Sequence, residues 1–398
     1  MKKVFVVLVM VILAGILATP TPTPTAPPEI RIGANDSMSG PGAQWGISFT
    51  RANEAGIDKI NKEGGLLVGD KRYMIKFFKY DNKVDPATSV ENTKMLIYTN
   101  KVNFIFHHAA TQVLPALPIT TENKIISIDV SSGDVTLSWP YNFNILVAPS
   151  FRSGISFQTW AKKFGIKKVA EVNPDTESGK NTQAVDRTSV KQQGIEMLSS
   201  LFYTVGTTDF YPILTKSLAV KPDMLVIGVG APGDVPLIVK QARELGWRGP
   251  IGETLGAPPA EAIFYKIAGK ASDGFVWSDT STSDPNFQTK EQQDWMKYWK
   301  EHWPNDPFIP DSFNGCQQIS ILTQAVQKAG SLDPDKIVQV LETSDLVVLG
   351  WKLHFGVTPN CYQGRPRSLQ SPLYLKTLKD GKEIVMDVLI PPGVEKVR

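Results

Sequence analysis

Residues that could support catalysis or metal binding are few and scattered in this chain. The sequence contains no G-x-S-x-G elbow, no Walker A lysine loop and no H-E-x-x-H motif. His107 and His108 are adjacent at the end of an expected strand, where neighbouring side chains point to opposite faces. Metal ligands on a strand favour alternate positions, so we expect one histidine to face a cleft while the other packs. We therefore expect no catalytic residues, no metal site and no cofactor.

A glycine-rich segment from Gly228 to Gly233 has the spacing G-x-G-x-x-G, which in dinucleotide-binding folds lies between a strand and a helix. The segment does follow an expected strand and precede an expected helix. However, Pro232 lies inside it, and the segment falls in mid-chain. These departures favour a structural turn over a nucleotide site.

Residues 1–19 have the layout of a secretory signal peptide. Lys2 and Lys3 form a basic start, and an uncharged run from Val4 to Ala18 ends in small residues. This run is shorter than the ~20 residues that span a bilayer, and no cysteine follows it to carry a lipid. Residues 20–28 are rich in Pro and Thr and are expected to form a disordered tether. We expect export to the periplasm or outer cell surface, with a membrane tether if the signal segment stays uncleaved.

The composition restricts the partners and the redox chemistry. A formal net charge of +3 gives no reason to expect nucleic acid as a partner. The two cysteines, Cys316 and Cys361, have no C-x-x-C spacing, so a zinc or redox site is not indicated. In an exported protein they can form one disulfide. Two unpaired thiols are the alternative, because the sequence does not fix the distance between them.

The order of apolar segments predicts the fold class. About 370 residues follow the tether, more than one hydrophobic core usually supports, so we expect two lobes. Short apolar strands alternate with helices between residues 30 and 128, and again between residues 150 and 246. This alternation predicts an α/β fold with two parallel sheets. Such sheets bind ligands at the carboxyl ends of their strands, which places a ligand in the cleft between the lobes.

Several short motifs occur in an order that is typical of one family. They are a Ser-Gly-Pro loop at 39–41, I-N-x-x-G-G at 60–65, Y-D at 80–81 with D-P at 85–86, G-x-x-D-F at 206–210, and P-D at 222–223 with Q-A-R-x-x-G at 241–246. Over about residues 30–390 the chain resembles type I periplasmic binding proteins of the branched-chain amino acid (Leu/Ile/Val-binding) group, which serve ABC importers. The resemblance implies two Rossmann-like lobes joined by three crossover strands. Lobe 1 would comprise residues 29–147 plus 276–350, and lobe 2 residues 148–275 plus 351–398.

The resemblance also indicates a ligand site in lobe 1. In amino acid-binding members the loop after the third strand holds the ligand carboxylate, and here that loop contains His108, Ala109 and Thr111. The histidine stands near a position where serine is usual. The next loop offers Ser131 or Ser132 as a hydroxyl donor, although both are equally compatible with a turn.

Further candidates come from lobe 2 and from the first loop. Ser178 stands where the family often has a tyrosine, so that aromatic wall is absent. Glu253, or Thr254 in another alignment, would take the place of the acid that binds the ligand ammonium, and an exposed Glu253 is the alternative. Ser39 belongs to the first loop, and Trp45 follows it and could either reach the cleft or pack.

We therefore expect a binding protein and not an enzyme. It would capture a small organic solute, an amino acid or another small carboxylate, by hinge closure of its lobes. Its partners would be this solute and the permease subunits of an ABC transporter, with the binding protein itself a monomer. A ligand-sensing module of the same fold, acting on a signalling or chemotaxis partner, is the alternative. The given sequence shows no signalling segment, which favours transport.

Overall fold

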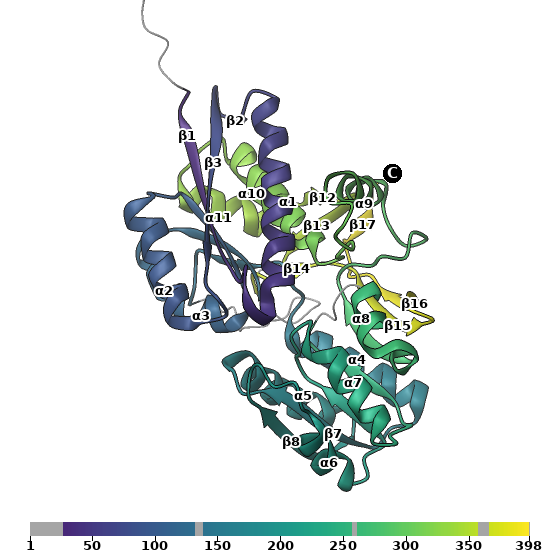
Figure 1. Cartoon of the computed structure of the whole chain (residues 1–398). Helices are drawn as coiled ribbons and strands as arrows, with labels where there is room; N and C mark the ends of the chain where they lie inside the picture. Colours follow the sequence, from purple (N-terminus) through teal and green to yellow (C-terminus); the bar gives the residue numbers. More distant parts are fainter. Residues whose placement is uncertain (1–26, 132–137, 257–260, 357–365, 398) are drawn as a thin grey trace, which may run out of the picture.

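The computed structural model describes residues 27–131, 138–256, 261–356 and 366–397, which form two α/β lobes (Figure 1). Lobe 1 contains a six-stranded sheet that is parallel except for its edge strand β2. In spatial order its strands are β2 (Leu66–Val68), β3 (Lys71–Asp81), β1 (Glu29–Asp36), β4 (Phe104–His108), β5 (Ile126–Val130) and β6 (Asn142–Asn144). Its helices are α1 (Ala43–Lys62), α2 (Pro86–Lys94) with the π-turn η2 (Met95–Thr99), α3 (Ala110–Glu122), α10 (Ser312–Ala329) and α11 (Pro334–Thr343).

Both faces of this sheet are buried, as the apolar strands predict. Phe104 and Phe106 of β4 belong to one core cluster, which includes residues of α1 and α10. Ile105, between them, belongs to a second cluster with Leu96, against which Ile119 of α3 packs. Successive side chains of one strand therefore enter cores on opposite faces, which is the reason that β4 is apolar without interruption until its two histidines.

Lobe 2 contains a seven-stranded sheet that ends in an antiparallel hairpin. In spatial order its strands are β16 (Lys382–Leu389), β15 (Leu373–Lys379), β11 (Phe275–Asp279), β10 (Ile251–Glu253), β9 (Met224–Ile227), β7 (Lys168–Pro174) and β8 (Glu196–Tyr203). Its helices are α4 (Pro149–Phe164), α5 (Glu177–Gln192), α6 (Tyr211–Ala219), α7 (Asp234–Glu244) and α8 (Glu261–Ala268). The two lobes confirm the predicted α/β class.

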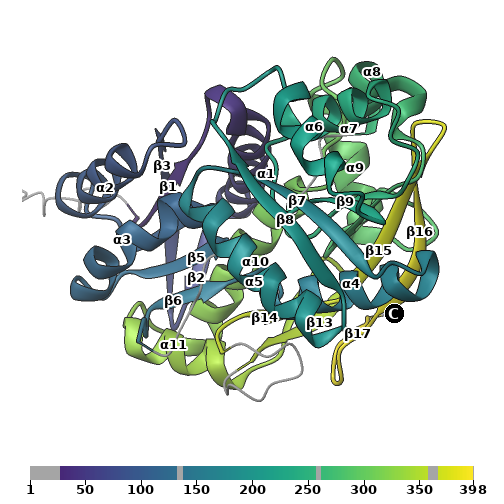
Figure 2. The same cartoon turned by 90° about the horizontal axis from the view of Figure 1, so that it is seen from below.

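A small antiparallel sheet lies beside lobe 1 (Figure 2). Its strands are β12 (Leu346–Val348), β13 (Trp351–Phe355), β14 (Leu369–Gln370) and β17 (Glu395–Lys396). Leu346, Leu353 and Leu369 share the core cluster of α1 and α10. The helix α9 (Lys290–His302) begins with a capping box of Thr289 and Gln292, and Thr289 also donates to the backbone oxygen of Leu349. The short 3₁₀ turns η1 (Gly40–Gly42) and η3 (Gly269–Ser272) complete the elements.

After β16 the chain returns to lobe 1 at β17. Before that return it crosses between the lobes three times, as the resemblance implies. The crossings connect β6 to α4, β11 to α9, and β14 to β15. Two of them lie side by side, because Asn144 and Ser368 form a parallel bridge.

The strand pairing moves two of the expected lobe boundaries. The expected return to lobe 1 at residue 276 falls inside β11, which pairs with β10 in the lobe 2 sheet. The expected return to lobe 2 at residue 351 falls at β13, which packs in the core of lobe 1, and β17 comes back to pair with β13. Both differences involve strand pairs that are distant in sequence, β11 with β15 and β13 with β17, which local patterns do not record.

Parts of the expected N-terminus and the disulfide fall outside the described residues. The signal peptide and most of the tether lie in residues 1–26. Cys361 also lies outside them, and Cys316 on α10 has no disulfide within the described part, so the pairing stays a prediction.

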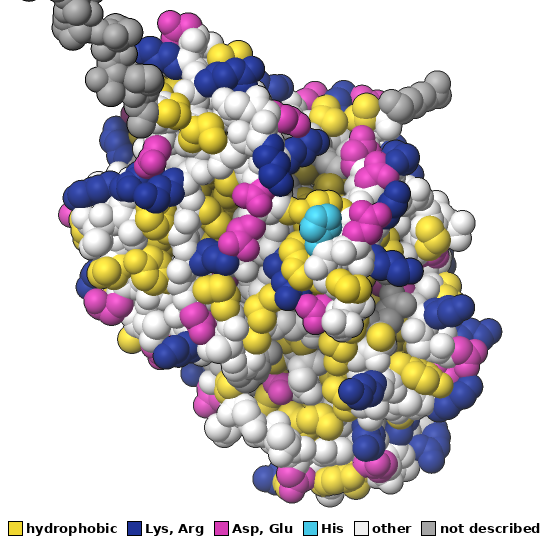
Figure 3. All heavy atoms as spheres, turned by 45° about the horizontal axis from the view of Figure 1, so that its top comes forward, with side chains coloured by type: hydrophobic (Ala, Val, Ile, Leu, Met, Phe, Trp, Pro, Cys, Tyr) yellow, Lys and Arg dark blue, Asp and Glu magenta, His cyan; other side chains and the backbone are white. Residues whose placement is uncertain are grey.

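Among the described helices, none has the length and apolar character to span a membrane. On the face in Figure 3, positive and negative side chains are interspersed, in keeping with the small net charge.

The contact between α1 and α10 holds lobe 1 together and yields a prediction. A Cβ atom at Gly315 would lie 2.5 Å from the backbone oxygen of Phe49 and 2.7 Å from Cβ of Ala52. We expect Gly315→Ala to lower the free energy of unfolding by about 1–3 kcal/mol through overpacking. Gly154→Ala in α4 is the control, since a Cβ there meets nothing within 4 Å and alanine favours a helix. Thermal unfolding of both variants checks this, and equal midpoints would contradict it.

Candidate ligand-binding cleft

A cavity lies where the carboxyl ends of strands from both lobes face each other. Its walls include Ser37 after β1 and His108 at the end of β4 from lobe 1, with Thr176 after β7, Gly230 after β9 and Asp279 at the end of β11 from lobe 2. The cavity contains about 990 Å³ of non-protein space, including space open to solvent. This position is the one predicted for a ligand of two opposed parallel sheets.

An aromatic wall in lobe 1 surrounds His108. The ring centroids of Trp45 and Phe49, both on α1, lie 5.3 and 4.8 Å from that of His108 in edge-on contacts. Burial lowers the pKa of His108 to about 3, so the ring is neutral at physiological pH. Its Nδ1 atom is buried without a hydrogen-bond partner among the described residues. His108 can therefore offer a ligand one neutral hydrogen bond at the edge of an apolar surface.

His107 occupies the opposite face of β4, as the alternation of a strand predicts. Its ring lies between the hydroxyls of Thr93 and Ser127, at 3.2 and 3.0 Å, and its side chain is fully buried. Asp129 lies 3.3 Å from Nδ1. The histidine pair is thus divided between a structural residue and a cavity residue, and the described residues contain no group of three or more possible metal ligands.

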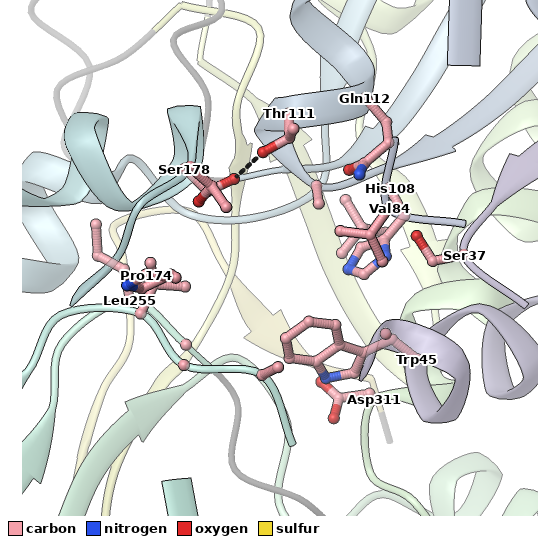
Figure 4. A pocket seen from close by; sticks show the side chains of 18 of the residues that line it. Ser37, Trp45, Val84, His108, Thr111, Gln112, Pro174, Ser178, Leu255 and Asp311 are labelled. Atoms are coloured by element: carbon pink, nitrogen blue, oxygen red, sulfur yellow. Dashed lines mark hydrogen bonds between the residues drawn. The ribbon is translucent and has the colours of Figure 1, made fainter. Parts of the chain in front are cut away.

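The N-termini of two helices, one from each lobe, meet at the cavity. Thr111 in the first turn of α3 and Ser178 in the first turn of α5 are joined by a hydrogen bond of 3.0 Å between their hydroxyls (Figure 4). Ala109 precedes α3 with a φ of 62°, a region that alanine enters only under strain of about 1–3 kcal/mol. Backbone N–H groups and the helix dipoles make such an end favourable for an anion.

Gln112 lies one residue beyond Thr111 and also lines the cavity. Its side chain is fully buried, and neither its amide nitrogen nor its amide oxygen has a partner among the described residues. Buried polar atoms are rarely left unpaired in folded proteins. A ligand or a bound water is the group that would pair with them here.

Arg152 of α4 brings a buried positive charge to the lobe 2 side of the cavity. Its guanidinium donates to Ser278 Oγ and Leu255 O, each at 3.2 Å, and to the backbone oxygens of Gly256 and Ser278. No carboxylate oxygen of the described residues lies within 4.0 Å of it. Burial lowers the pKa of Arg152, and Asp279 and Glu253 act in the opposite direction. A ligand carboxylate would therefore gain from this charge.

Ten site residues were expected, and nine of them are described. Five line the cavity, and Ser39, Ser131, Glu253 and Thr254 do not. Those that do are Trp45, His108, Ala109, Thr111 and Ser178. Ser39 is exposed directly before the turn η1, and Ser37 lies at the cavity in its place. Ser131 is buried, and its backbone is bonded to the Asn144 side chain. Ser132 lies outside the described residues.

Glu253 and Thr254 stand behind the cavity wall. The Oε1 atom of Glu253 accepts a hydrogen bond of 2.9 Å from the backbone N–H of Gly230, a wall residue. Thr254 donates to Asp186 at 2.6 Å and contacts the Gly228 oxygen at 2.9 Å. Both side chains are fully buried and neither is among the residues that line the cavity, so the exposed alternative for Glu253 is wrong, and the ammonium contact stays a prediction. They position the loop that carries Val229 and Gly230.

Several residues that line the cavity were not predicted from the sequence. They are Ser37, Phe49, Gln112, Arg152, Asp234, Asp279, Asp311 and Asn314. For Asp279 a usable signal was present, because it is the polar residue that closes the apolar strand 275–279. Arg152 and Asp311 gave no such signal, since Arg152 lies in a helix and Asp311 directly before one, and neither sequence differs from that of an ordinary helix.

The burial of Glu253 yields a prediction about pH. Burial raises the pKa of Glu253 from its ordinary 4.5 to about 8. Between these values the folded protein holds more protons than the unfolded chain, so this group lowers the free energy of unfolding as pH rises, by at most about 1.4 kcal/mol per pH unit. Glu253→Gln keeps an acceptor for Gly230 and does not titrate, so its stability should fall less between about pH 6 and pH 8.

Thermal melts across that pH range measure the effect. Glu301→Gln, at an exposed position of α9, is the matched control and should follow the wild-type slope. An unchanged slope in Glu253→Gln would show that the carboxyl group stays ionised in its buried position.

Comparison with known proteins agrees with this geometry. The sequence model of a family described as periplasmic binding protein matches residues 29–382. A leucine-, isoleucine-, valine-, threonine- and alanine-binding protein of Pseudomonas aeruginosa is 21% identical over 322 residues, covering 79% of this chain and 82% of that protein.

Two solved structures with bound ligands share the fold. A branched-chain amino acid transporter substrate-binding protein of Streptococcus pneumoniae, in complex with isoleucine, has a TM-score of 0.75 and 20% identity over 91% of this chain and all of that one. A solute-binding protein of an ABC transporter from Rhodopseudomonas palustris, in complex with benzoate, has a TM-score of 0.77 and 19% identity over 91% of this chain and 97% of that one. The match of the family model to most of the chain shows that this protein belongs to the periplasmic binding protein family, whose members bind solutes and are not enzymes.

Proposed function

We propose that this protein is the extracytoplasmic solute-binding component of an ABC importer and that it captures a small carboxylate with an apolar body. The observation that carries the proposal is the meeting of two helix N-termini, from α3 and α5, across one cavity. A carboxylate placed there would accept hydrogen bonds from both lobes. It would thereby favour the closed arrangement over the open one.

The charges around the cavity support an anionic group in the solute. The hydroxyls of Thr111 and Ser178 can turn from each other toward a ligand oxygen. Arg152 lines the same cavity without an acidic partner within 4.0 Å among the described residues. A neutral sugar would leave these features without a role.

The walls support a solute with an apolar body. Trp45, Phe49 and Val84 line the lobe 1 side, and Val229 and Leu255 line the lobe 2 side. Burial of apolar surface contributes about 25 cal/mol per Å². The relatives are named for Leu, Ile and Val or were solved with isoleucine or benzoate, all of which combine a carboxylate with an apolar group. Ser178 and His108 replace family contacts, which is why the proposal names the chemical class and not one amino acid.

Screening by thermal shift tests this proposal. Purified protein is mixed with small aliphatic and aromatic carboxylates, with amino acids, and with sugars and nucleosides as controls. A ligand present at 100 times its Kd adds about 2.7 kcal/mol to the free energy of unfolding, so the expected result is a raised midpoint for one or more carboxylates. Stabilisation by sugars or nucleosides alone would overturn the proposal.

His108 provides a second test with a bound carboxylate from that screen. We expect His108→Ala to weaken binding at least tenfold, which is ~1.4 kcal/mol, because it removes a neutral hydrogen-bonding group and part of the aromatic wall. His302→Ala is the control, since His302 is exposed on α9 and stacks on Tyr298. Calorimetric titration of both variants measures the effect, and wild-type affinity in His108→Ala would remove His108 from the contact surface.

A further inference from the structure

Asp311 is an acidic residue whose position is not explained by the helix that it precedes. It occupies the N-cap position of α10, where an aspartate usually accepts a hydrogen bond from the second or third backbone N–H of the helix. Its side chain makes no capping bond. The residue is 6% exposed and lines the ligand cavity. The carboxyl group is therefore buried at the cavity and does not cap its helix.

Among the described residues Asp311 forms no ion pair. Lys376, the nearest buried lysine, lies 3.4 Å from Asp279 Oδ2 and 3.0 Å from Glu383 Oε2. The donors of Arg152 go to a hydroxyl and to backbone oxygens of lobe 2. Within the described part of the chain, no basic nitrogen lies within 4.0 Å of the Asp311 carboxylate. A buried carboxylate with neither an ion pair nor a capping bond is costly unless a further group completes it.

A second unpaired acceptor lies on the same face of α10. Asn314 follows Asp311 by three residues, a spacing that places two side chains next to each other on a helix. Asn314 also lines the cavity, and its Oδ1 atom is buried without a partner among the described residues. The Asp311 carboxyl group and Asn314 Oδ1 are thus acceptors to which no described residue donates a hydrogen bond. A solute group with several N–H donors could bond to both.

Trp45 adds a surface that attracts positive charge. It lines the same cavity, and Figure 4 draws Trp45 and Asp311 on the side of the cavity opposite the bond between Thr111 and Ser178. The face of an indole ring attracts a cation through its quadrupole. The helix N-termini on one side of the cavity thus suit an anion, and the acidic and aromatic groups on the other side suit a cation, with Arg152 opposing part of that attraction.

We propose that Asp311 and Asn314, in the cavity that Trp45 also lines, form a subsite for a protonated amine of the solute. The inference rests on the proposed function and adds a chemical class to it: a small carboxylate that carries its cationic nitrogen at the far end of an apolar chain. Such a solute would place its carboxylate at the α3 and α5 N-termini and its ammonium at α10. The bound solute would then extend from the N-termini of α3 and α5 to the crossover region.

Titration of Asp311 supports the geometry and adds a readout. Burial, together with Asp279 of β11, raises the pKa of Asp311 to about 8; Glu383 of β16 acts in the same direction, and Lys376 of β15 and Arg152 of α4 act against it. A bound ammonium favours the ionised carboxylate, so binding below that pH expels a proton. The affinity for an amine-bearing solute should therefore rise as pH increases toward 8, by at most about tenfold per pH unit.

Calorimetric titration with matched pairs of probes tests the subsite. Butanoate, pentanoate and hexanoate are each compared with the acid of the same length that carries an ω-amino group. In the wild-type protein at least one amino acid of this kind should bind at least tenfold more tightly than its unsubstituted partner. In Asp311→Asn the two affinities of that pair should differ less than twofold, and the rise of affinity with pH should be lost.

Controls separate the subsite from the fold and from the proposed function. Asp294→Asn, at an exposed position of α9, should keep the wild-type preference. Burial raises the pKa of the Asp311 carboxyl group, so the melting midpoint of Asp311→Asn should not be lower than that of the wild-type protein. Thermal melts of the variant therefore check directly that it is folded. Equal binding of every amino and unsubstituted pair, or a preference for leucine over its deaminated analogue alone, would overturn the subsite. Failure of every carboxylate in the thermal-shift screen and in this panel would instead overturn the proposed function.

Discussion

The parallel strands of both lobes are covered by helices on each face, and they can meet a ligand only beyond their carboxyl ends. The cleft follows from this constraint. Residues at or directly after the ends of β1, β4, β7, β9 and β11 line the same cavity, although their positions in the chain extend from Ser37 to Asp279. Helices that begin immediately after these strands bring their N-termini to the same place, so the topology supplies both the space and the field for an anion.

Burial decides which polar groups of the cleft carry charge. It keeps His108 neutral and raises the pKa values of Glu253 and Asp311 to about 8. Arg152, by contrast, is surrounded by backbone oxygens that accept its donors, so it can stay charged in a wall with little water. Burial thus reduces the charge that His108, Glu253 and Asp311 carry, and a ligand with charges of its own supplies partners for the polar groups of the cleft.

The fold class could be predicted from the sequence because the patterns that indicate strands, helices and turns are local. Apolar strands alternating with helices, and turns such as Gly64-Gly65, are fixed by neighbouring residues, and they led to the correct class and cleft. His108, Thr111 and Ser178 were named from the family resemblance, and they line the cavity because each lies at a strand or helix end. The lobe boundaries and the role of Glu253 were missed because they depend on pairings across more than twenty residues, such as β11 with β15 and Glu253 with Gly230.

Asp311, Asp279 and Arg152 show why the rest of the site could not be predicted. They come from three elements that meet only because the chain crosses between the lobes, at β11 to α9 and at β6 to α4. Groups at the crossings move least when two lobes rotate about them, whereas Thr111 and Ser178 lie on helices that the rotation separates. A solute held at both ends would therefore be fixed first by the crossover region, and closure would then depend on how far its carboxylate extends toward α3 and α5.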